Sequence, residues 1–271
     1  MLETVLDECN KDINEYIHSK TPVQQYNNSE QSSQQSSKRR RIDAVVTDID
    51  GTLTDNNRLI NIAAIEKIRW VASQNVPVIL ASGNTACLMH GVSRFFGTSG
   101  TFIAENGGVY RIGFLGPVTV YAPRDLILEA FEYLRLYYEN LGTPLNLYSY
   151  RERFSDIAFE KAMPVEEIKS ILTHFHTKIT VLDTGFAIHL QQAGVNKGET
   201  LKLVAKEMGL SLSHMLAIGD SINDIEMISC VGYGACVGNG APELKSVSPY
   251  CASAAYGDGF IEIIEHFFDV I

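Results

Sequence analysis

Four aspartates form two short acidic groups whose residue types suit the binding of a metal ion. Asp48 and Asp50 end an apolar run and precede Gly51, while Asp220 and Asp224 form a second group much further along the chain. A turn at Gly51 lets both carboxylates of the first group face one pocket. Carboxylates held close together repel and need a shared proton or a cation. Oxygen ligands without histidine or thiolate are typical of Mg²⁺, so we predict a Mg²⁺ site.

Each acidic group also has a purely structural interpretation. Asp followed by Gly is common in a plain turn after a strand. Asp220 could cap the helix that follows it, and Asp224 could lie in the first turn of that helix, where a negative charge is favourable. The metal-binding interpretation therefore requires the two groups to meet in space.

Two further segments could bind an anionic group. Ser82, Gly83 and Asn84 follow a second apolar run, and Lys197 opens a predicted helix. A serine hydroxyl and the N–H groups of a helix start can bind phosphoryl oxygens, although an ordinary N-cap would look the same. A lysine at a helix N-terminus opposes the helix dipole. A buried anion would explain Lys197, and a solvated lysine is the alternative.

Continuous apolar runs place these polar residues at the ends of strands. The four runs are Ala44–Thr47, Val76–Ala81, Thr101–Ala104 and Met215–Ile218, and helical patterns separate them. Such runs predict a parallel sheet covered by helices on both faces, which is a doubly wound α/β fold. Ligands bind such sheets at the carboxyl ends of the strands. The polar residues converge on that edge.

Residues 121–191 follow a different pattern. A helix with apolar residues at helical intervals precedes two short strands, and a second helix over 165–175 precedes two more. The order αββαββ predicts a small four-stranded sheet backed by two helices. We interpret 121–191 as an inserted α+β domain, so that 43–120 and 192–271 together form the core.

Residues 1–42 differ from the rest of the chain. Apolar residues at helical spacing over 2–17 predict a short amphipathic helix. Residues 22–37 consist mainly of Gln, Asn and Ser, and this composition buries too little surface to fold. Lys38–Arg41 is a basic run that could serve nuclear import or anion binding. A solvated charge cluster beside a strand is the preferred interpretation.

Composition limits the classes of function. The 271 residues carry a net charge of −10, which disfavours broad attraction to nucleic acid or anionic lipid. The five cysteines form no CxxC pair, so we predict reduced, mostly buried thiols and no disulfide framework or zinc site. No apolar run has the length of a membrane span, and no signal-peptide pattern is present. We expect a soluble cytoplasmic protein, either a monomer or a homodimer.

The polar groups, taken in order along the chain, resemble the motifs of the haloacid dehalogenase superfamily of phosphohydrolases over about residues 43–271. The 31 residues between Asp50 and Ser82 leave no room for a cap domain, whereas the 114 between Ser82 and Lys197 do. The insertion is similar to that of Cof-like members, which carry an α+β cap between the second and third motifs. The Glu105–Gly108 turn also resembles that subclass. The small αββαββ cap, together with Ser-Gly-Asn at Ser82, is similar to the archaeal-type phosphoglycolate phosphatases.

This resemblance implies hydrolysis of a small phosphorylated metabolite, with phosphoglycolate as the first candidate. It implies that Asp48 attacks phosphorus to form an aspartyl-phosphate, and that Asp50 protonates the leaving group and then activates water. The other implied roles are Mg²⁺ binding by Asp48, Asp220, Asp224 and the backbone carbonyl of Asp50, and binding or orientation of the phosphate by Ser82, Gly83, Lys197 and Asn223.

Substrate choice is expected to lie with the inserted domain. Arg151 and Arg153 could meet a substrate carboxylate, or could be surface residues of a loop, and we interpret His189 as a packed histidine. One alternative function is a phosphatase for sugar phosphates or other small phosphoesters. Another is a binding protein without turnover, which has no need of Asp50. A nucleic-acid-associated factor would rest on Lys38–Arg41, and the acidic body disfavours it.

Overall fold

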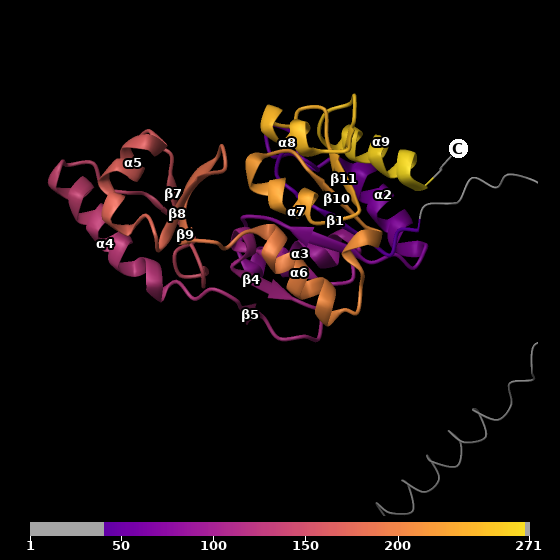
Figure 1. Ribbon diagram of the computed structural model, residues 1–271, viewed down its shortest axis with the longest axis horizontal. Coiled ribbons are helices and arrows are strands. Elements are labelled where there is room, and N and C mark those ends of the chain that lie inside the picture. The colour runs from indigo at the N-terminus through magenta and orange to yellow at the C-terminus, as the bar shows by residue number, and fades with distance from the viewer. Residues whose placement is uncertain (1–40, 269–271) are drawn as a thin grey trace, which may run out of the picture. The chain divides into compact units, whose positions relative to one another are not determined.

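The computed structural model describes residues 41–268, and within them a core and an inserted cap (Figure 1). The core holds an eight-stranded sheet in the order β12-β11-β10-β1-β2-β3-β4-β5. Its strands are β1 (Ala44–Thr47), β2 (Val78–Ala81), β3 (Phe102–Ala104), β4 (Val109–Arg111), β5 (Thr119–Val120), β10 (Met215–Gly219), β11 (Tyr233–Cys236) and β12 (Tyr250–Cys251). Its helices are α2 (Ile62–Ser73), α3 (Ala86–Phe96), α6 (Lys197–Glu207), α7 (Ile225–Ser229), α8 (Pro242–Val247) and α9 (Tyr256–Phe268).

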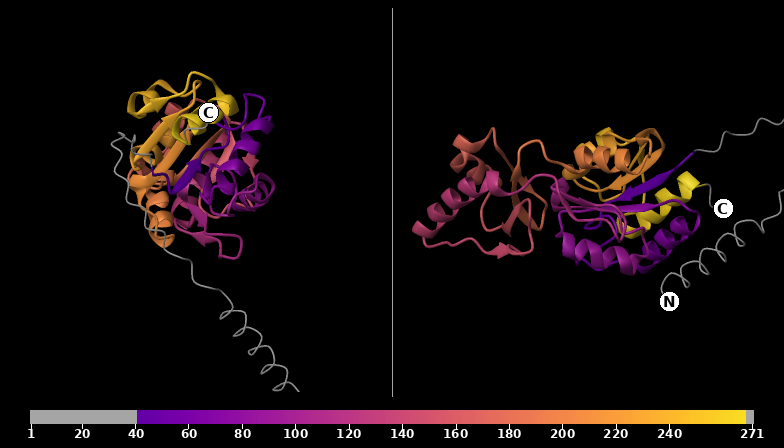
Figure 2. Two further views of the ribbon diagram at one scale, coloured as in Figure 1. Left: turned by 90° about the vertical axis from the view of Figure 1, so that its right-hand side faces the viewer. Right: turned by 90° about the horizontal axis from the view of Figure 1, so that it is seen from below.

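Helices cover both faces of the core sheet, because its strands are apolar on both sides (Figure 2). Val45 of β1 packs in a cluster with residues of α2, α3 and α9. Its neighbour Val46 points to the opposite face, into a cluster with residues of α6, α7 and α8. The predicted doubly wound α/β fold is therefore confirmed.

The sheet is parallel from β12 through to β3, whereas β4 and β5 pair antiparallel at its edge. The sequence analysis missed these two strands. They are only three and two residues long, and β4 follows β3 after one 3₁₀ turn, Glu105–Gly107. An apolar run of that length carries little periodic signal.

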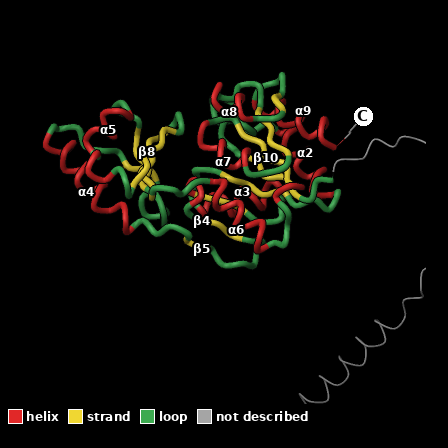
Figure 3. Tube along the Cα trace, in the orientation of Figure 1, coloured by secondary structure: helices red, strands yellow, loops and turns green. Residues whose placement is uncertain are grey.

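The cap has the predicted order of elements. Figure 3 shows its two helices, α4 and α5, beside its strands. Its antiparallel sheet runs β6-β7-β9-β8, and α4 and α5 bury apolar residues in one cluster with it. We keep 121–191 as our proposal for the limits of this domain. The cap elements are α4 (Asp125–Asn140), β6 (Leu147–Tyr148), β7 (Ile157–Glu160), α5 (Val165–Ile171), β8 (Ile179–Asp183) and β9 (Ala187–Gln192).

The prediction that the cysteines are reduced and mostly buried has a mixed outcome. Cys87, Cys230, Cys236 and Cys251 are free thiols, but Cys87 and Cys251 are exposed, so the prediction of mostly buried cysteines is wrong for this part of the chain. Cys87 lies on α3 and Cys251 on the edge strand β12.

The expected N-terminal helix and polar tract fall outside the described residues. No helix within 41–268 is long and apolar enough to cross a membrane.

The cap core depends on Phe131 of α4, which is 1% exposed. We predict that Phe131→Ala lowers the free energy of unfolding by about 3–5 kcal/mol, because it leaves a cavity among packed side chains. Leu136 on the same helix is 51% exposed, and Leu136→Ala should cost only about 0.5 kcal/mol. Urea unfolding followed by circular dichroism measures both. Equal losses for the two variants would contradict this packing.

Candidate active site

The predicted site residues meet because β1 lies between β10 and β2, parallel to both. Asp48 follows β1, Ser82 follows β2 and Asp220 follows β10, so all three leave the sheet at the same edge. They line a pocket of about 730 Å³, together with Asp50 and Gly83. Asn223 also lines it, whereas Lys197 and Asp224 are buried and reach the site through their bonds to other side chains.

Gly51 makes the turn that brings both carboxylates of the first group into the pocket. Its φ is +90°, a left-handed conformation that glycine adopts without strain. A Cβ at this position would collide with the carboxylate of Asp220. The same turn lets Asp50 accept hydrogen bonds from the Asn84 amide at 2.6 Å and the Ser82 hydroxyl at 3.4 Å.

Lys197 binds two carboxylates at the bottom of the site. Its side chain is 1% exposed, and Nζ lies 2.6 Å from Oδ1 of Asp48 and 2.7 Å from Oδ1 of Asp224. Burial alone would lower the pKa of Lys197, but Asp224 and Asp48 outweigh it and raise the pKa above its ordinary value. The lysine is therefore a fixed cation, and buried anions compensate its unfavourable place at the start of α6.

Asp48, Asp220 and Asp224 offer oxygen atoms that all lie within 4.8 Å of one another. Burial raises the pKa of Asp48 well above its ordinary value, and the three other nearby aspartates add to the shift while Lys197 opposes it. Burial and Asp224 raise the pKa of Asp220 to about 7. A divalent cation would relieve this repulsion, and an all-oxygen donor set fits Mg²⁺.

The structure does not support the interpretation of Asp220 as a helix cap. Ser221, not Asp220, is the N-cap, and Asp224 completes a capping box with it. The second oxygen of Asp224 accepts the backbone N–H groups of Asp220 and Ser221, both at 3.1 Å. Asp224 thus binds Lys197 through one carboxylate oxygen and holds the loop through the other.

Ser82 is not a helix cap either, because α3 begins at Ala86 with Thr85 as its N-cap. The Ser82 hydroxyl instead accepts hydrogen bonds from the backbone N–H of Asn84 at 3.1 Å and from its amide at 2.9 Å. The sequence analysis gave Asn84 no role, although it positions both Ser82 and Asp50. The sequence signal that could have indicated this role is the position of Asn84, two residues after Ser82 in the same turn.

Asn223 connects the loop after β10 to the turn after β3. Its amide donates to Oδ1 of Asn106 at 3.1 Å, and Asn106 is 1% exposed. Asn106 itself lies at φ +53°, within the Glu105–Gly107 turn. From the sequence, this turn was noted only as part of a family resemblance. Its contact with Asn223 is evident only in the three-dimensional structure.

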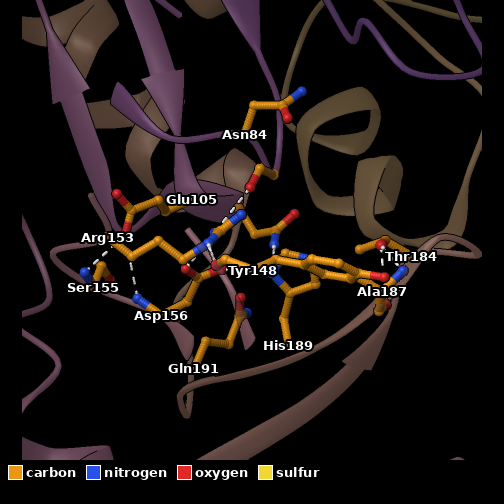
Figure 4. A network of polar contacts seen from close by, with 12 residues as sticks. Asn84, Glu105, Tyr148, Arg153, Ser155, Asp156, Thr184, Ala187, His189 and Gln191 are labelled. Carbon is orange, nitrogen blue, oxygen red and sulfur yellow. Dashed lines mark hydrogen bonds and ion pairs between the residues drawn. The ribbon is translucent and has the colours of Figure 1, made fainter. Parts of the chain in front are cut away.

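Glu105 joins the core to the cap. Its carboxylate accepts the backbone N–H groups of Phe154 at 3.0 Å, Ser155 at 2.8 Å and Asp156 at 3.3 Å, in the loop between β6 and β7 (Figure 4). Burial and the Asp156 carboxylate raise the pKa of Glu105 to about 7, against the effect of these N–H donors. This residue was not among the predicted site residues.

Two relatives and one family model identify the fold of the site. The model of the haloacid dehalogenase-like hydrolases matches residues 45–152 and 149–264. The chain belongs to this family. The hydrolase is 49% identical over 224 residues to a phosphoglycolate phosphatase of Methanospirillum hungatei, covering 83% of this chain and 96% of that protein. It is 46% identical, with the same coverage, to a phosphoglycolate phosphatase of Methanoculleus marisnigri.

Solved structures of other proteins have the same fold as this hydrolase. A protein of Thermoplasma acidophilum aligns with a TM-score of 0.74 and 25% identity, covering 84% of this chain and 98% of that one. A haloacid dehalogenase-like hydrolase of Bacteroides thetaiotaomicron aligns with a TM-score of 0.70 and 19% identity, covering 84% and 100%. Their coverage includes the cap as well as the core.

In this hydrolase, Lys197 compensates the buried charge of Asp48 and Asp224. We predict that Lys197→Met lowers the free energy of unfolding of the metal-free protein by about 3–5 kcal/mol, because two buried carboxylates lose their partner. Lys202 lies on the same helix with 46% of its side chain exposed, and Lys202→Met should change stability by less than about 0.5 kcal/mol. Urea unfolding in the presence of a chelator tests both. A Lys197 variant as stable as the Lys202 variant would contradict the assignment.

The raised pKa of Glu105 predicts a pH dependence of stability. A carboxyl that ionises near 7 in the folded hydrolase and near 4.5 when unfolded stabilises the fold in its protonated form. That contribution is present at low pH and is lost as the pH rises through about 7. The stability of the wild type relative to Glu105→Gln should therefore fall between about pH 5 and about pH 8, as urea unfolding would show. A difference that rises with pH would contradict it.

Proposed function

We propose that this chain is a Mg²⁺-dependent phosphatase that hydrolyses phosphoglycolate to glycolate and phosphate, with Asp48 as its nucleophile. The observation that carries the proposal is the buried contact of Lys197 with Asp48 and Asp224, beside Asp50 and Asp220 at one sheet edge. A buried carboxylate held by a cation, with a second carboxylate in the same pocket, supplies a nucleophile and a proton carrier.

Asp48 is suited to attack phosphorus. Its Oδ1 is held by Lys197, which fixes the side chain in one orientation. Asp48, Asp220 and Asp224 would hold Mg²⁺, with the Asp50 carbonyl as a further proposed ligand. When bound, the metal neutralises negative charge on the transferring phosphoryl group. Attack forms a bond from Asp48 to phosphorus and breaks the bond from phosphorus to the ester oxygen.

Asp50 is suited to move the protons of both steps. The Asn84 amide and the Ser82 hydroxyl hold its Oδ2, and Asp50 lines the pocket two residues after the nucleophile. In its protonated form Asp50 gives its proton to the leaving alkoxide. The resulting carboxylate then takes a proton from the water that attacks the aspartyl-phosphate and releases inorganic phosphate.

The remaining polar groups would hold the phosphoryl oxygens. Ser82 and Gly83 lie at the carboxyl end of β2, where the pocket begins. Lys197 offers a permanent positive charge next to Asp48, so charge that develops on the phosphoryl group meets a fixed partner. Asn223 binds Asn106 and would keep the metal-binding loop in place.

The size of the pocket supports a second candidate. A volume of about 730 Å³ exceeds what a molecule as small as phosphoglycolate fills, so sugar phosphates and other small phosphoesters are alternative substrates. A binding protein without turnover has less support, because nothing in such a role needs Asp50 in the pocket.

Turnover of a panel of phosphoesters tests the proposal. We predict that phosphate release from phosphoglycolate requires Mg²⁺ and that Asp48→Asn lowers it by at least about 10³-fold while the fold is retained, since the nucleophile is lost. Asp50→Asn should lower turnover as well, and more for esters with poor leaving groups, because Asp50 acts as the acid. Asp55→Asn is a matched control, because Asp55 does not line the pocket and its Oδ1, which an asparagine retains, accepts backbone N–H groups of its own turn. Near-normal turnover by Asp48→Asn would exclude the nucleophile.

A further inference from the structure

Three buried side chains of the cap form a charged network on the wall of the pocket. Arg153 is 7% exposed, His189 4% and Asp156 0%. Nη1 of Arg153 lies 2.5 Å from Oδ1 of Asp156, and Nδ1 of His189 lies 2.6 Å from Oδ2 (Figure 4). One carboxylate therefore binds two basic side chains, and both of these line the pocket.

This network leaves one nitrogen atom on each basic side chain without a partner among the described residues. Nε of Arg153 donates to the carbonyl of Tyr148 and Nη1 to Asp156 and to the carbonyl of Gly83. Across residues 41–268, no hydrogen bond involves Nη2 of Arg153 or Nε2 of His189. Nδ1 of His189 faces the Asp156 carboxylate and donates its proton there, and Nε2 donates to an anionic ligand when the ring carries its second proton.

The network lies close to the proposed phosphoryl site. Nη1 of Arg153 is 3.1 Å from the carbonyl oxygen of Gly83, in the turn that also carries Ser82. Arg153 therefore lies beside the turn that would hold the phosphoryl group, and both line the same pocket.

Charge compensation also favours an anion here. Arg153 and His189 both bind the single carboxylate of Asp156, so two basic side chains share one counter-charge within the network. The pKa of Asp156 is held below its ordinary value because His189 and Arg153 outweigh the effect of burial, so Asp156 stays ionised. The nearby Glu105 has its own partners in three backbone N–H groups, and Asp183 of the pocket pairs with Lys161.

We propose that Arg153 and His189, oriented by Asp156, bind the carboxylate of the substrate through Nη2 and Nε2. The proposal rests on the phosphatase function above and names the feature that separates phosphoglycolate from other small phosphoesters. A carboxylate bonded to both donors completes their hydrogen bonding and balances the charge of the network. Asp156 acts as a positioning residue, because it binds both donors and does not itself face an anionic ligand.

Two other arginines serve as comparisons. Arg151 lies two residues before Arg153, but it is exposed and does not line the pocket. Arg58 does line the pocket, on the loop after Asp50, and its guanidinium lies 4.1 Å from the ring centre of Phe186 in the cap. Arg58 is exposed, so solvent screens its charge more than that of Arg153.

The experiment compares phosphoglycolate with ethyl phosphate, which has the same phosphoryl group and no carboxylate. His189→Asn keeps a donor at the position of Nδ1 for Asp156 but removes Nε2. We expect it to raise the KM for phosphoglycolate about tenfold or more and to leave the KM for ethyl phosphate within about twofold. Arg153→Lys, which keeps the charge for Asp156 but loses the planar guanidinium, should behave alike. Arg151→Ala should change neither KM.

Equal losses for both esters would overturn the proposal, because they would show a structural role alone. A selective loss in Arg58→Ala, with His189→Asn unchanged, would also overturn it and move the carboxylate site to Arg58. If the wild type hydrolyses neither ester, the proposed function fails, and equilibrium binding decides the inference separately. In an Asp48→Asn background with Mg²⁺, phosphoglycolate should then bind about tenfold more tightly than ethyl phosphate, and adding His189→Asn should remove the difference. Equal binding of the two esters would contradict the site.

Discussion

The structure depends on one buried ammonium group shared by two carboxylates. Lys197 is separated from Asp48 by 149 positions in the sequence and from Asp224 by 27, yet Nζ lies within 2.7 Å of an oxygen of each. A buried charge without a partner is costly, so the three residues must come together whenever the core folds. Lys197 follows the cap directly in the chain, so this contact also fixes where the chain re-enters the core after the insertion.

The topology of the core satisfies that requirement. With β1 between β10 and β2, the loops that carry Asp48, Ser82 and Asp220 leave the sheet side by side. The aspartates gathered there repel, and Lys197 compensates only part of their charge, which is why the pKa values of Asp48 and Asp220 are raised. This arrangement suits the proposed cation and an anionic substrate, and the carboxylates that the proposed mechanism uses reduce the stability of the protein when neither is bound.

Much of this could be predicted from the sequence, for identifiable reasons. Strands with apolar residues on both faces fix the doubly wound fold, and Gly51 after Asp50 predicts the turn that the structure contains. Lys197 at a helix start was unfavourable unless an anion lay beside it, and the structure supplies two. The contacts of Glu105, Asn106 and His189 could not be predicted, because each joins segments that are far apart in the chain. Glu105 meets a loop about 50 residues later, and Asn106 bonds Asn223 across 117 positions.

The central claim is that Asp48 carries the phosphoryl group during turnover. The most direct test is to quench the Asp50→Asn variant with acid while it turns over p-nitrophenyl phosphate in the presence of Mg²⁺, then to analyse its peptides by mass spectrometry. This variant retains the nucleophile, and nitrophenolate leaves without an acid, but the base for the second step is missing, so the intermediate should accumulate. The account predicts one phosphoryl group on Asp48, and none after chelation of the metal. Phosphate release without any phosphorylated peptide, or a phosphoryl group on another residue, would contradict it.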